Sequence, residues 1–165
     1  MPDGYGPIPA KNCRDGQKRI NESDFIKNKN PYFPGIYISP QKILVTGSSG
    51  TIGTRLCELL LKTGYHVFGT DIRSNPWNKT IDKLTIIADL CRKEDLERLP
   101  ADVDMVIHLA ANARVYNLVV DPALARDNFE MLFNILEFCR RHSIPGFLFS
   151  SSREVYGNSD HVVHR

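Results

Sequence analysis

The sequence predicts an α/β fold in which a doubly wound parallel sheet is covered by helices on both faces. From Lys42 onward, short apolar runs alternate with amphipathic stretches, a pattern typical of βαβ units. A glycine-rich turn joins the first apolar run to the first amphipathic stretch. The 165 residues are enough for one domain with a buried core.

Five strands and three helices follow from this pattern. The expected strands are Lys42–Thr46, His66–Asp71, Leu84–Ala88, Met105–Ala110 and Gly146–Ser150. The expected helices are Ile52–Thr63, Arg92–Leu99 and Pro122–His142. Apolar residues recur at three- and four-residue spacing in the last helix and predict its buried face: Ala125, Phe129, Leu132, Phe133, Leu136 and Cys139.

The first forty residues differ from the rest in composition. They hold six of the ten prolines, and they show neither a helical nor an alternating apolar period. We expect residues 1–40 to form a disordered or loosely docked extension and residues 41–165 to form the domain. The net charge of +2 arises in this extension, since residues 41–165 hold fifteen basic and fifteen acidic side chains. No nucleic-acid partner is therefore expected.

Other features narrow the class of protein further. No run approaches eighteen apolar residues and no signal pattern opens the chain, so we expect a soluble cytoplasmic protein without a membrane partner. The four cysteines form no CxxC pair, and His161 and His164 lack a third ligand. We expect no metal site.

The strongest local signal is the segment KILVTGSSGTIGTRL. Gly47, Gly50 and Gly53 lie between an apolar strand and an amphipathic helix, with Thr51 and Ile52 among them. Glycines here allow a sharp turn and let backbone N–H groups approach a pyrophosphate at the N-terminus of the helix. The segment predicts a dinucleotide-binding turn, and all five residues are candidate cofactor-binding positions.

A carboxylate follows where such a site needs one. Asp71 ends the second strand, eighteen residues after Gly53, and it can accept hydrogen bonds from the adenosine ribose hydroxyls. A carboxylate there repels a 2′-phosphate, so NAD is favoured over NADP. Arg73 keeps NADP open as the less favoured cofactor, because its guanidinium can attract that phosphate.

The G-x-x-G-x-x-G spacing resembles the short-chain dehydrogenase/reductase superfamily, and later motifs resemble its extended branch, the NAD-dependent epimerase/dehydratase family that acts on nucleotide sugars. These motifs run in order from Lys42 to about Asn158. They comprise Asp89-Leu90, the HLAA segment His108–Ala111, Pro122, Asn128, and the segment Phe149–Gly157, which is similar to SSxxVYG. The resemblance implies a Rossmann-like fold that this chain follows only through the fifth strand.

The resemblance also implies roles for individual residues. Asp89 and Leu90 are expected to meet the adenine ring, Ser152 to be the catalytic serine, and the rest to line the cofactor: Leu109, Ala110, Ala111, Asn128 and Ser150. Each motif alone has a plainer interpretation. His108 reads as a packed strand residue, Asn128 as a polar helix position, and the serines as a hydrophilic strand end.

The implied mechanism needs a tyrosine base and a lysine four residues after it. No YxxxK occurs in the sequence, and Tyr156 is followed four residues later by Asp160. We therefore expect a truncated chain that lacks the substrate lobe, keeps the adenosine and pyrophosphate half of the cofactor site, and is inactive alone.

Several alternatives and partners follow from the same resemblance. The complete enzyme is expected to be a homodimer acting on a nucleotide sugar, and this chain is expected to self-associate. A non-catalytic NAD(P)-binding or sensing module remains an alternative, as does a reductase of a non-sugar substrate.

Overall fold

The computed structural model describes residues 41–152. The expectations for residues 1–40, for the Val155–Gly157 part of the serine motif, and for His161 and His164 concern residues outside this range. No helix within 41–152 is both long and apolar enough to cross a membrane.

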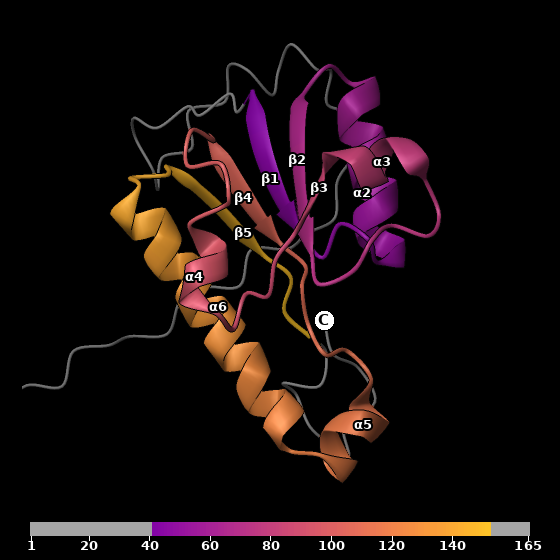
Figure 1. The fold of residues 1–165 in the computed structure, drawn as a ribbon, viewed down its shortest axis with the longest axis vertical. Coiled ribbons are helices and arrows are strands. Elements are labelled where there is room, and N and C mark those ends of the chain that lie inside the picture. The colour runs from indigo at the N-terminus through magenta and orange to yellow at the C-terminus, as the bar shows by residue number, and fades with distance from the viewer. Residues whose placement is uncertain (1–40, 153–165) are drawn as a thin grey trace, which may run out of the picture. The chain divides into compact units, whose positions relative to one another are not determined.

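A five-stranded parallel sheet forms the centre of the domain (Figure 1). Its spatial order is β3-β2-β1-β4-β5, and every neighbouring pair runs parallel. The predicted fold class, a Rossmann-like doubly wound sheet, is confirmed. The strands are β1 (Lys42–Thr46), β2 (His66–Asp71), β3 (Thr85–Ile87), β4 (Met105–His108) and β5 (Gly146–Phe149).

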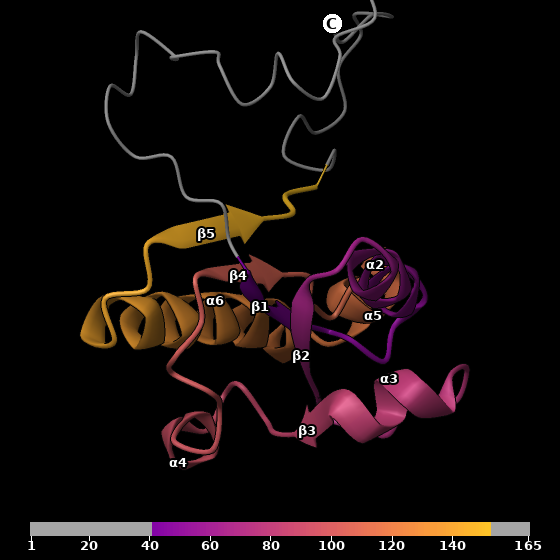
Figure 2. The ribbon, with the colours of Figure 1, turned by 90° about the horizontal axis from the view of Figure 1, so that it is seen from above.

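Helices cover both faces of the sheet. Figure 2 shows α2 and α3 on one side and α4 and α6 on the other. The helices are α2 (Thr51–Lys62), α3 (Lys79–Leu84), α4 (Lys93–Leu96), α5 (Val115–Val120) and α6 (Ala123–Arg141). The short helix α5 precedes α6 and contacts it.

Each face of the sheet carries its own hydrophobic core. Ile43 and Val45 of β1 face one core, shared with Cys57 of α2. Leu44 faces the other, shared with Ile135 and Phe138 of α6. Successive side chains of a strand point to opposite faces, so a strand buried on both faces is apolar throughout, as the run Ile43–Val45 is.

The helices differ from expectation in three places. Helix α3 was not predicted, although Asn78 caps it by accepting hydrogen bonds from the N–H groups of Thr80 and Ile81. Helix α5 was not predicted either, and its three valines favour strands over helices. The predicted helix Arg92–Leu99 shortens to α4, and beyond it Leu99 bonds three residues back, to Leu96.

The predicted buried face of α6 is wrong at three of its six residues. Phe129, Phe133 and Leu136 are 75%, 57% and 42% exposed. The buried residues are Met131, Asn134, Ile135, Phe138 and Cys139, of which only Cys139 was predicted, while Ala125 and Leu132 are half-buried. Apolar residues occupy two adjoining faces of this helix, and periodicity alone does not show which one meets the sheet.

Candidate functional site

The turn between β1 and α2 accommodates only glycine at two positions. Gly47 has a φ of +71°, and a Cβ there would lie 2.9 Å from the backbone nitrogen of Ala110. A Cβ on Gly53 would lie 2.1 Å from the carbonyl oxygen of Gly47. Gly47 is required because its backbone is left-handed, and Gly53 is required because helix and turn are in close contact there.

The N-terminus of α2 is open. Gly50 is the N-cap and provides no side-chain hydrogen bond, and the first turn holds no acidic residue. The first helical bond runs from the N–H of Thr54 to the oxygen of Gly50 at 2.9 Å. The N–H groups of Thr51, Ile52 and Gly53 have no partner within residues 41–152. Unpaired donors together with the helix dipole favour an anion such as a phosphate.

Asp71 is fixed beside this turn. Its Oδ2 accepts a hydrogen bond from the N–H of Ser49 at 3.0 Å, and its Oδ1 accepts one from the N–H of Arg73 at 3.3 Å. The carboxylate retains lone pairs for the hydroxyls of a ribose. The carbonyl of Arg73 accepts a bond from the Ser49 hydroxyl at 2.9 Å, so Arg73 is anchored to the same turn while its side chain is exposed.

Asn75 supports the glycine turn, a role that was not predicted from the sequence. Its side chain is 7% exposed, and its Nδ2 donates to the oxygen of Ser48 at 3.1 Å and to Oγ1 of Thr54 at 2.8 Å. Its Oδ1 accepts from the N–H groups of Trp77 and Asn78. The Asn-Pro pair at 75–76 signals a turn, but it does not indicate the contact with Ser48.

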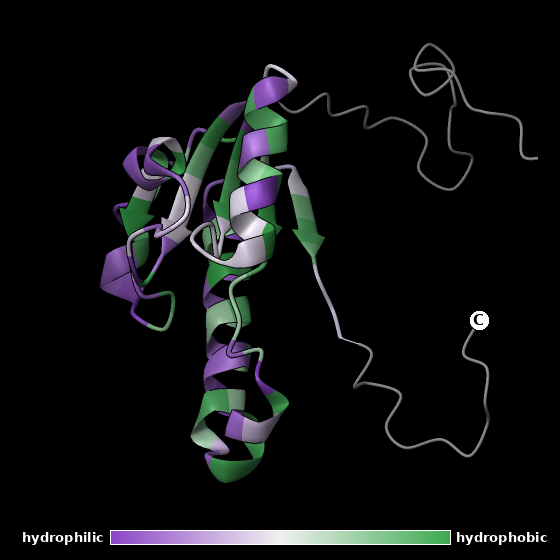
Figure 3. Ribbon diagram, turned by 90° about the vertical axis from the view of Figure 1, so that its right-hand side faces the viewer, coloured by the Kyte–Doolittle hydropathy of each residue, from purple (hydrophilic) through white to green (hydrophobic). Residues whose placement is uncertain are grey.

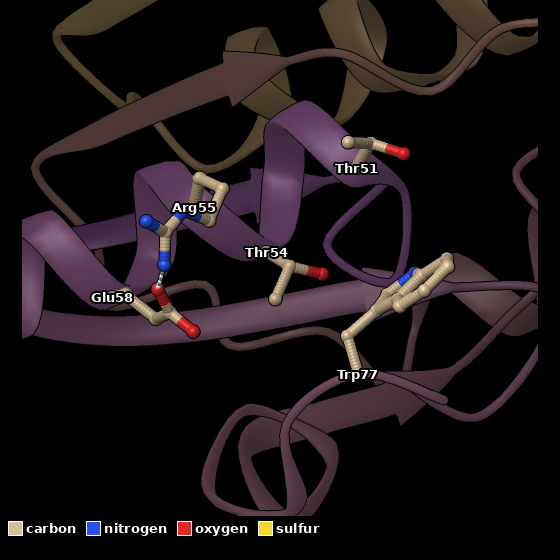
Figure 4. A pocket seen from close by; sticks show the side chains of 5 residues that line it. All are labelled: Thr51, Thr54, Arg55, Glu58 and Trp77. Carbon is tan, nitrogen blue, oxygen red and sulfur yellow. Dashed lines mark hydrogen bonds and ion pairs between the residues drawn. The ribbon is translucent and has the colours of Figure 1, made fainter.

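A pocket of about 250 Å³ flanks the first turns of α2. Figure 4 shows the Thr54 hydroxyl directed toward the Trp77 ring, while Arg55 and Glu58 form an ion pair away from it. Thr51 lines this pocket and also follows the glycine turn. The pocket therefore extends from the N-terminal end of α2 along its outer flank.

Asp89 and Leu90 follow β3 but present different groups. Oδ1 of Asp89 accepts a bond from the N–H of Cys91 at 2.9 Å, and its own N–H donates to Asp95. The Leu90 side chain is 3% exposed and belongs to the core, and its carbonyl accepts a bond from Asn134. The Leu90 side chain is therefore a core contact, and this position has only its main chain to offer a ligand.

His108 is a packed strand residue, as its plainer interpretation held. It is 2% exposed, and its Nδ1 lies 2.8 Å from Oγ1 of Thr46. The same hydroxyl oxygen accepts bonds from the N–H groups of Leu109 and Ala110, both at 3.1 Å. Thr46 thus holds the start of the loop that follows β4.

Asn128 reaches the far end of that loop. Its Oδ1 accepts a bond from the N–H of Asn112 at 2.7 Å, and its Nδ2 donates to the oxygen of Asn112 at 3.2 Å. Asn112 was not among the predicted site residues. The two residues are sixteen positions apart, so the pairing has no local signal.

The serine motif begins at the carboxyl end of β5. The N–H of Ser150 donates to the oxygen of His108 at 3.3 Å, and the side chains of Ser150 and Ser152 are exposed. Ser150 is thereby placed beside the end of β4. Parallel strands end on the same side of the sheet, so one edge collects the candidate residues that follow them. These are the glycine turn, Asp71, the Leu109–Ala111 loop and Ser150.

The centre of this edge is a topological switch point. β1 pairs with β2 on one side and with β4 on the other, so the strand order reverses there. In open α/β sheets, ligands bind outside the carboxyl ends of the strands at such a point. Ile52 and Ile72 are 73% and 68% exposed, and they add apolar surface next to the polar groups.

Comparison with known proteins agrees with this geometry. Residues 43–164 match the model of the NAD dependent epimerase/dehydratase family. An uncharacterised UDP-glucose epimerase, YtcB, of Bacillus subtilis (strain 168) is 38% identical over 136 residues, which are 74% of this chain and 43% of that protein. A UDP-glucose 4-epimerase of Pisum sativum is 33% identical over 140 residues, 75% of this chain and 40% of that protein.

Solved structures show the same fold. The Thermus thermophilus UDP-glucose 4-epimerase in complex with NAD superimposes with a TM-score of 0.61 at 31% identity, over 67% of this chain and 37% of that one. The Bifidobacterium longum enzyme with NAD⁺ and UDP gives a TM-score of 0.66 at 27% identity, over 73% and 40%. The chain spans about two fifths of the length of the relatives that it matches. On its motifs, fold and family match, this chain belongs to the NAD-dependent epimerase/dehydratase family.

Proposed function

We propose that this chain binds NAD across the switch point and supplies the cofactor-binding part of a nucleotide-sugar epimerase or dehydratase. One observation carries the proposal: the open N-terminus of α2 lies beside a carboxylate that the same turn fixes at the end of β2. A phosphate group and a ribose diol are the ligand groups that suit these two features.

Each part of the edge takes one part of the cofactor in this proposal. The N–H groups of Thr51 and Ile52 bind the pyrophosphate, and Asp71 binds the adenosine ribose. Asp89 and the main chain of Leu90 meet the adenine ring. The nicotinamide half lies over the ends of β4 and β5, beside the loop Leu109–Ala111 and Ser150. When bound, NAD accepts a hydride from a sugar carbon and can return it.

Ser152 is the proposed catalytic serine. It lies beyond the end of β5 with an exposed side chain, where its hydroxyl can donate a hydrogen bond to the sugar oxygen that reacts. The family's tyrosine base and lysine, in YxxxK spacing, do not occur among the 165 residues. We infer that this chain binds the cofactor without turning over a substrate.

The substrate class is proposed from the relatives. Those compared above are described as UDP-glucose epimerases. A further structural neighbour, TunA, is an NAD-dependent NDP-hexosamine 5,6-dehydratase, with a TM-score of 0.63 at 28% identity. A nucleoside diphosphate sugar is common to these descriptions, whereas the reaction is epimerisation in some and dehydration in the other. We therefore propose a nucleotide-sugar substrate for the complete enzyme.

Calorimetric titration of the chain with NAD and NADP tests the cofactor proposal. NAD should bind at least about tenfold more tightly, because the Asp71 carboxylate repels a 2′-phosphate. Asp71→Ala should reduce the difference between the affinities for NAD and NADP. Asp102→Ala is the matched control, since Asp102 forms its ion pair with Lys42 at the opposite end of β1. Equal or tighter binding of NADP by the unmodified chain would show that Arg73 governs the choice.

A further inference from the structure

The loop that leaves β4 is held by side chains at both ends. At its start, Oγ1 of Thr46 accepts hydrogen bonds from the N–H groups of Leu109 and Ala110. At its end, the amide of Asn128 pairs with both backbone groups of Asn112. The Asn112 side chain adds a third attachment, because its Nδ2 donates to the oxygen of Leu124 at 3.1 Å.

The anchor lies on α6, a helix whose later turns pack against the sheet. Further along the helix, Ile135 and Phe138 are 0% and 1% exposed and pack against the sheet. A side-chain amide that accepts from one N–H and donates to the oxygen of the same residue fixes that residue in both position and orientation. The loop is therefore attached to the sheet through Thr46 and to α6 through Asn128.

The two attachments leave one backbone donor available. Of the four N–H groups in residues 109–112, those of Leu109, Ala110 and Asn112 are engaged. The N–H of Ala111 has no partner within the described range, and Ala111 is exposed. This donor lies at the carboxyl end of β4, on the side of the switch point away from Asp71.

We propose that Asn128 is a positioning residue that acts through Asn112 and holds the 109–112 loop so that the N–H of Ala111 meets an oxygen of the nicotinamide half of NAD. This inference rests on the proposed function. It differs from the expectation for Asn128, which was direct contact with the cofactor. The adenosine half lies over β2 and β3, so its binding does not depend on this loop.

Comparing NAD with ADP separates the two halves. The 165-residue chain and its variants are titrated with each ligand, and the exchange rate of the Asn112 amide hydrogen is measured. Asn128→Ala removes two hydrogen bonds and should weaken NAD about tenfold while changing ADP affinity less than about twofold. Exchange at Asn112 should become faster. Asn117→Ala is the matched control, because Asn117 lies on the exposed surface of α5.

Two further variants make the test specific. Asn128→Asp keeps an oxygen that accepts from the N–H of Asn112, so it should recover part of the lost affinity for NAD and part of the protection at Asn112. Asn112→Ala removes only the bond to Leu124 and should weaken NAD about threefold. It provides the same comparison if the Asn128→Ala protein does not fold.

Four results would overturn the inference. The first is an equal loss of ADP and NAD affinity in Asn128→Ala, which would indicate a role in overall folding. The second is unchanged NAD affinity despite faster exchange at Asn112. The third is an Asp variant that protects Asn112 and yet binds NAD as weakly as the Ala variant, which would make Asn128 a direct ligand. The fourth is an unmodified chain that binds neither NAD nor ADP, and this result alone would also overturn the proposed function.

Discussion

The hydroxyl of Thr46 determines the protonation of a buried histidine. Because it accepts hydrogen bonds from two backbone N–H groups, its own proton is directed to Nδ1 of His108. The imidazole is then neutral and carries its proton on Nε2. Burial disfavours the charged form and lowers the pKa of His108 to about 4. One side chain thus fixes both the loop after β4 and the tautomer of the ring.

Replacing Thr46 should show how much its hydroxyl contributes to stability. Thr46→Val keeps the shape but leaves the N–H of Ala110 without its acceptor and Nδ1 of His108 without its donor, while the N–H of Leu109 keeps the backbone oxygen of Thr46 at 3.3 Å. It should therefore lower the free energy of unfolding by about 2–4 kcal/mol. Thr46→Ser retains the hydroxyl and is the matched control, with an expected loss of about 1 kcal/mol for the missing methyl group. Urea denaturation measures both values. Equal losses in the two variants would contradict the role of the hydroxyl.

His108 should make stability depend on pH. The unfolded chain binds a proton near the ordinary pKa of 6.5, whereas the folded chain does so only near 4. Stability is therefore complete above pH 6.5 and falls as the pH drops toward 4, by about 2 kcal/mol at pH 5. Urea denaturation at pH 7.5 and pH 5 should show this loss.

His108→Gln is the control for that measurement, because glutamine does not titrate. Its stability should change less between the two pH values than that of the unmodified chain. Parallel pH dependence in the two proteins would assign the effect to other groups.

Local patterns predicted where the candidate site residues lie but not which residues support them. The positions of the glycine turn and of Asp71 at the end of β2 were predictable because their spacing along the chain reflects the geometry of one βαβ unit. Asn75 and Asn112 were not, since their partners Ser48 and Asn128 lie 27 and 16 residues away. A polar side chain that forms a hydrogen bond with a backbone group far away in the chain produces no periodic pattern in the sequence.

At the scale of elements, α6 presents apolar residues to two environments. Its inner face fills the core, and its outer face exposes Phe129, Phe133 and Leu136. Helix α5 adds exposed Tyr116 and Val119. Figure 3 also shows hydrophobic colour on α5 and on the edge strand β5. Exposed apolar side chains on the contacting helices α5 and α6 favour association.

Substitutions on the two faces of α6 should therefore affect different properties: stability on the inner face and self-association on the outer face. Ile135→Ala removes a fully buried side chain and should lower the free energy of unfolding by about 2–4 kcal/mol. Phe133→Ser changes an exposed residue and should alter stability by less than about 0.5 kcal/mol while reducing self-association. Light scattering at tens of micromolar measures the latter. A monodisperse, unmodified monomer would contradict the expectation.

The sequence predicted the strands and the long helix α6 better than the short helices. Each strand appears as a short apolar run, and the 19 residues of α6 span several helical periods, so these elements were evident even where their ends shifted. Helices α3 and α5 have six residues each, too few for periodicity to show. Only the N-cap of α3, Asn78, carried a readable signal.

At the scale of the molecule, the proposed function concerns cofactor binding rather than a complete active site. The chain supplies the proposed cofactor edge and Ser152, but its 165 residues contain no YxxxK. The fold and family were predictable because five motifs occur in order. The substrate was not, because the positions that bind a sugar are not among the motifs present.

We expect no turnover from the purified chain. Losing a general base typically costs about 10²–10⁴-fold, and losing the positioning of the sugar costs more. Assays with NAD and a panel of UDP-, dTDP- and GDP-sugars should stay at background. Turnover that Ser152→Ala abolishes would show that another side chain acts as the base.

The order of the strands also has a kinetic consequence. No two adjacent strands are joined by a hairpin, and the central strand β1 meets β4 across 62 residues of chain, with Ile43 opposite Met105. Closing so long a loop costs chain entropy before any contact compensates for it. The β1–α2–β2 unit has the shorter loop and can assemble first. Completing the other half of the sheet then limits the rate of folding.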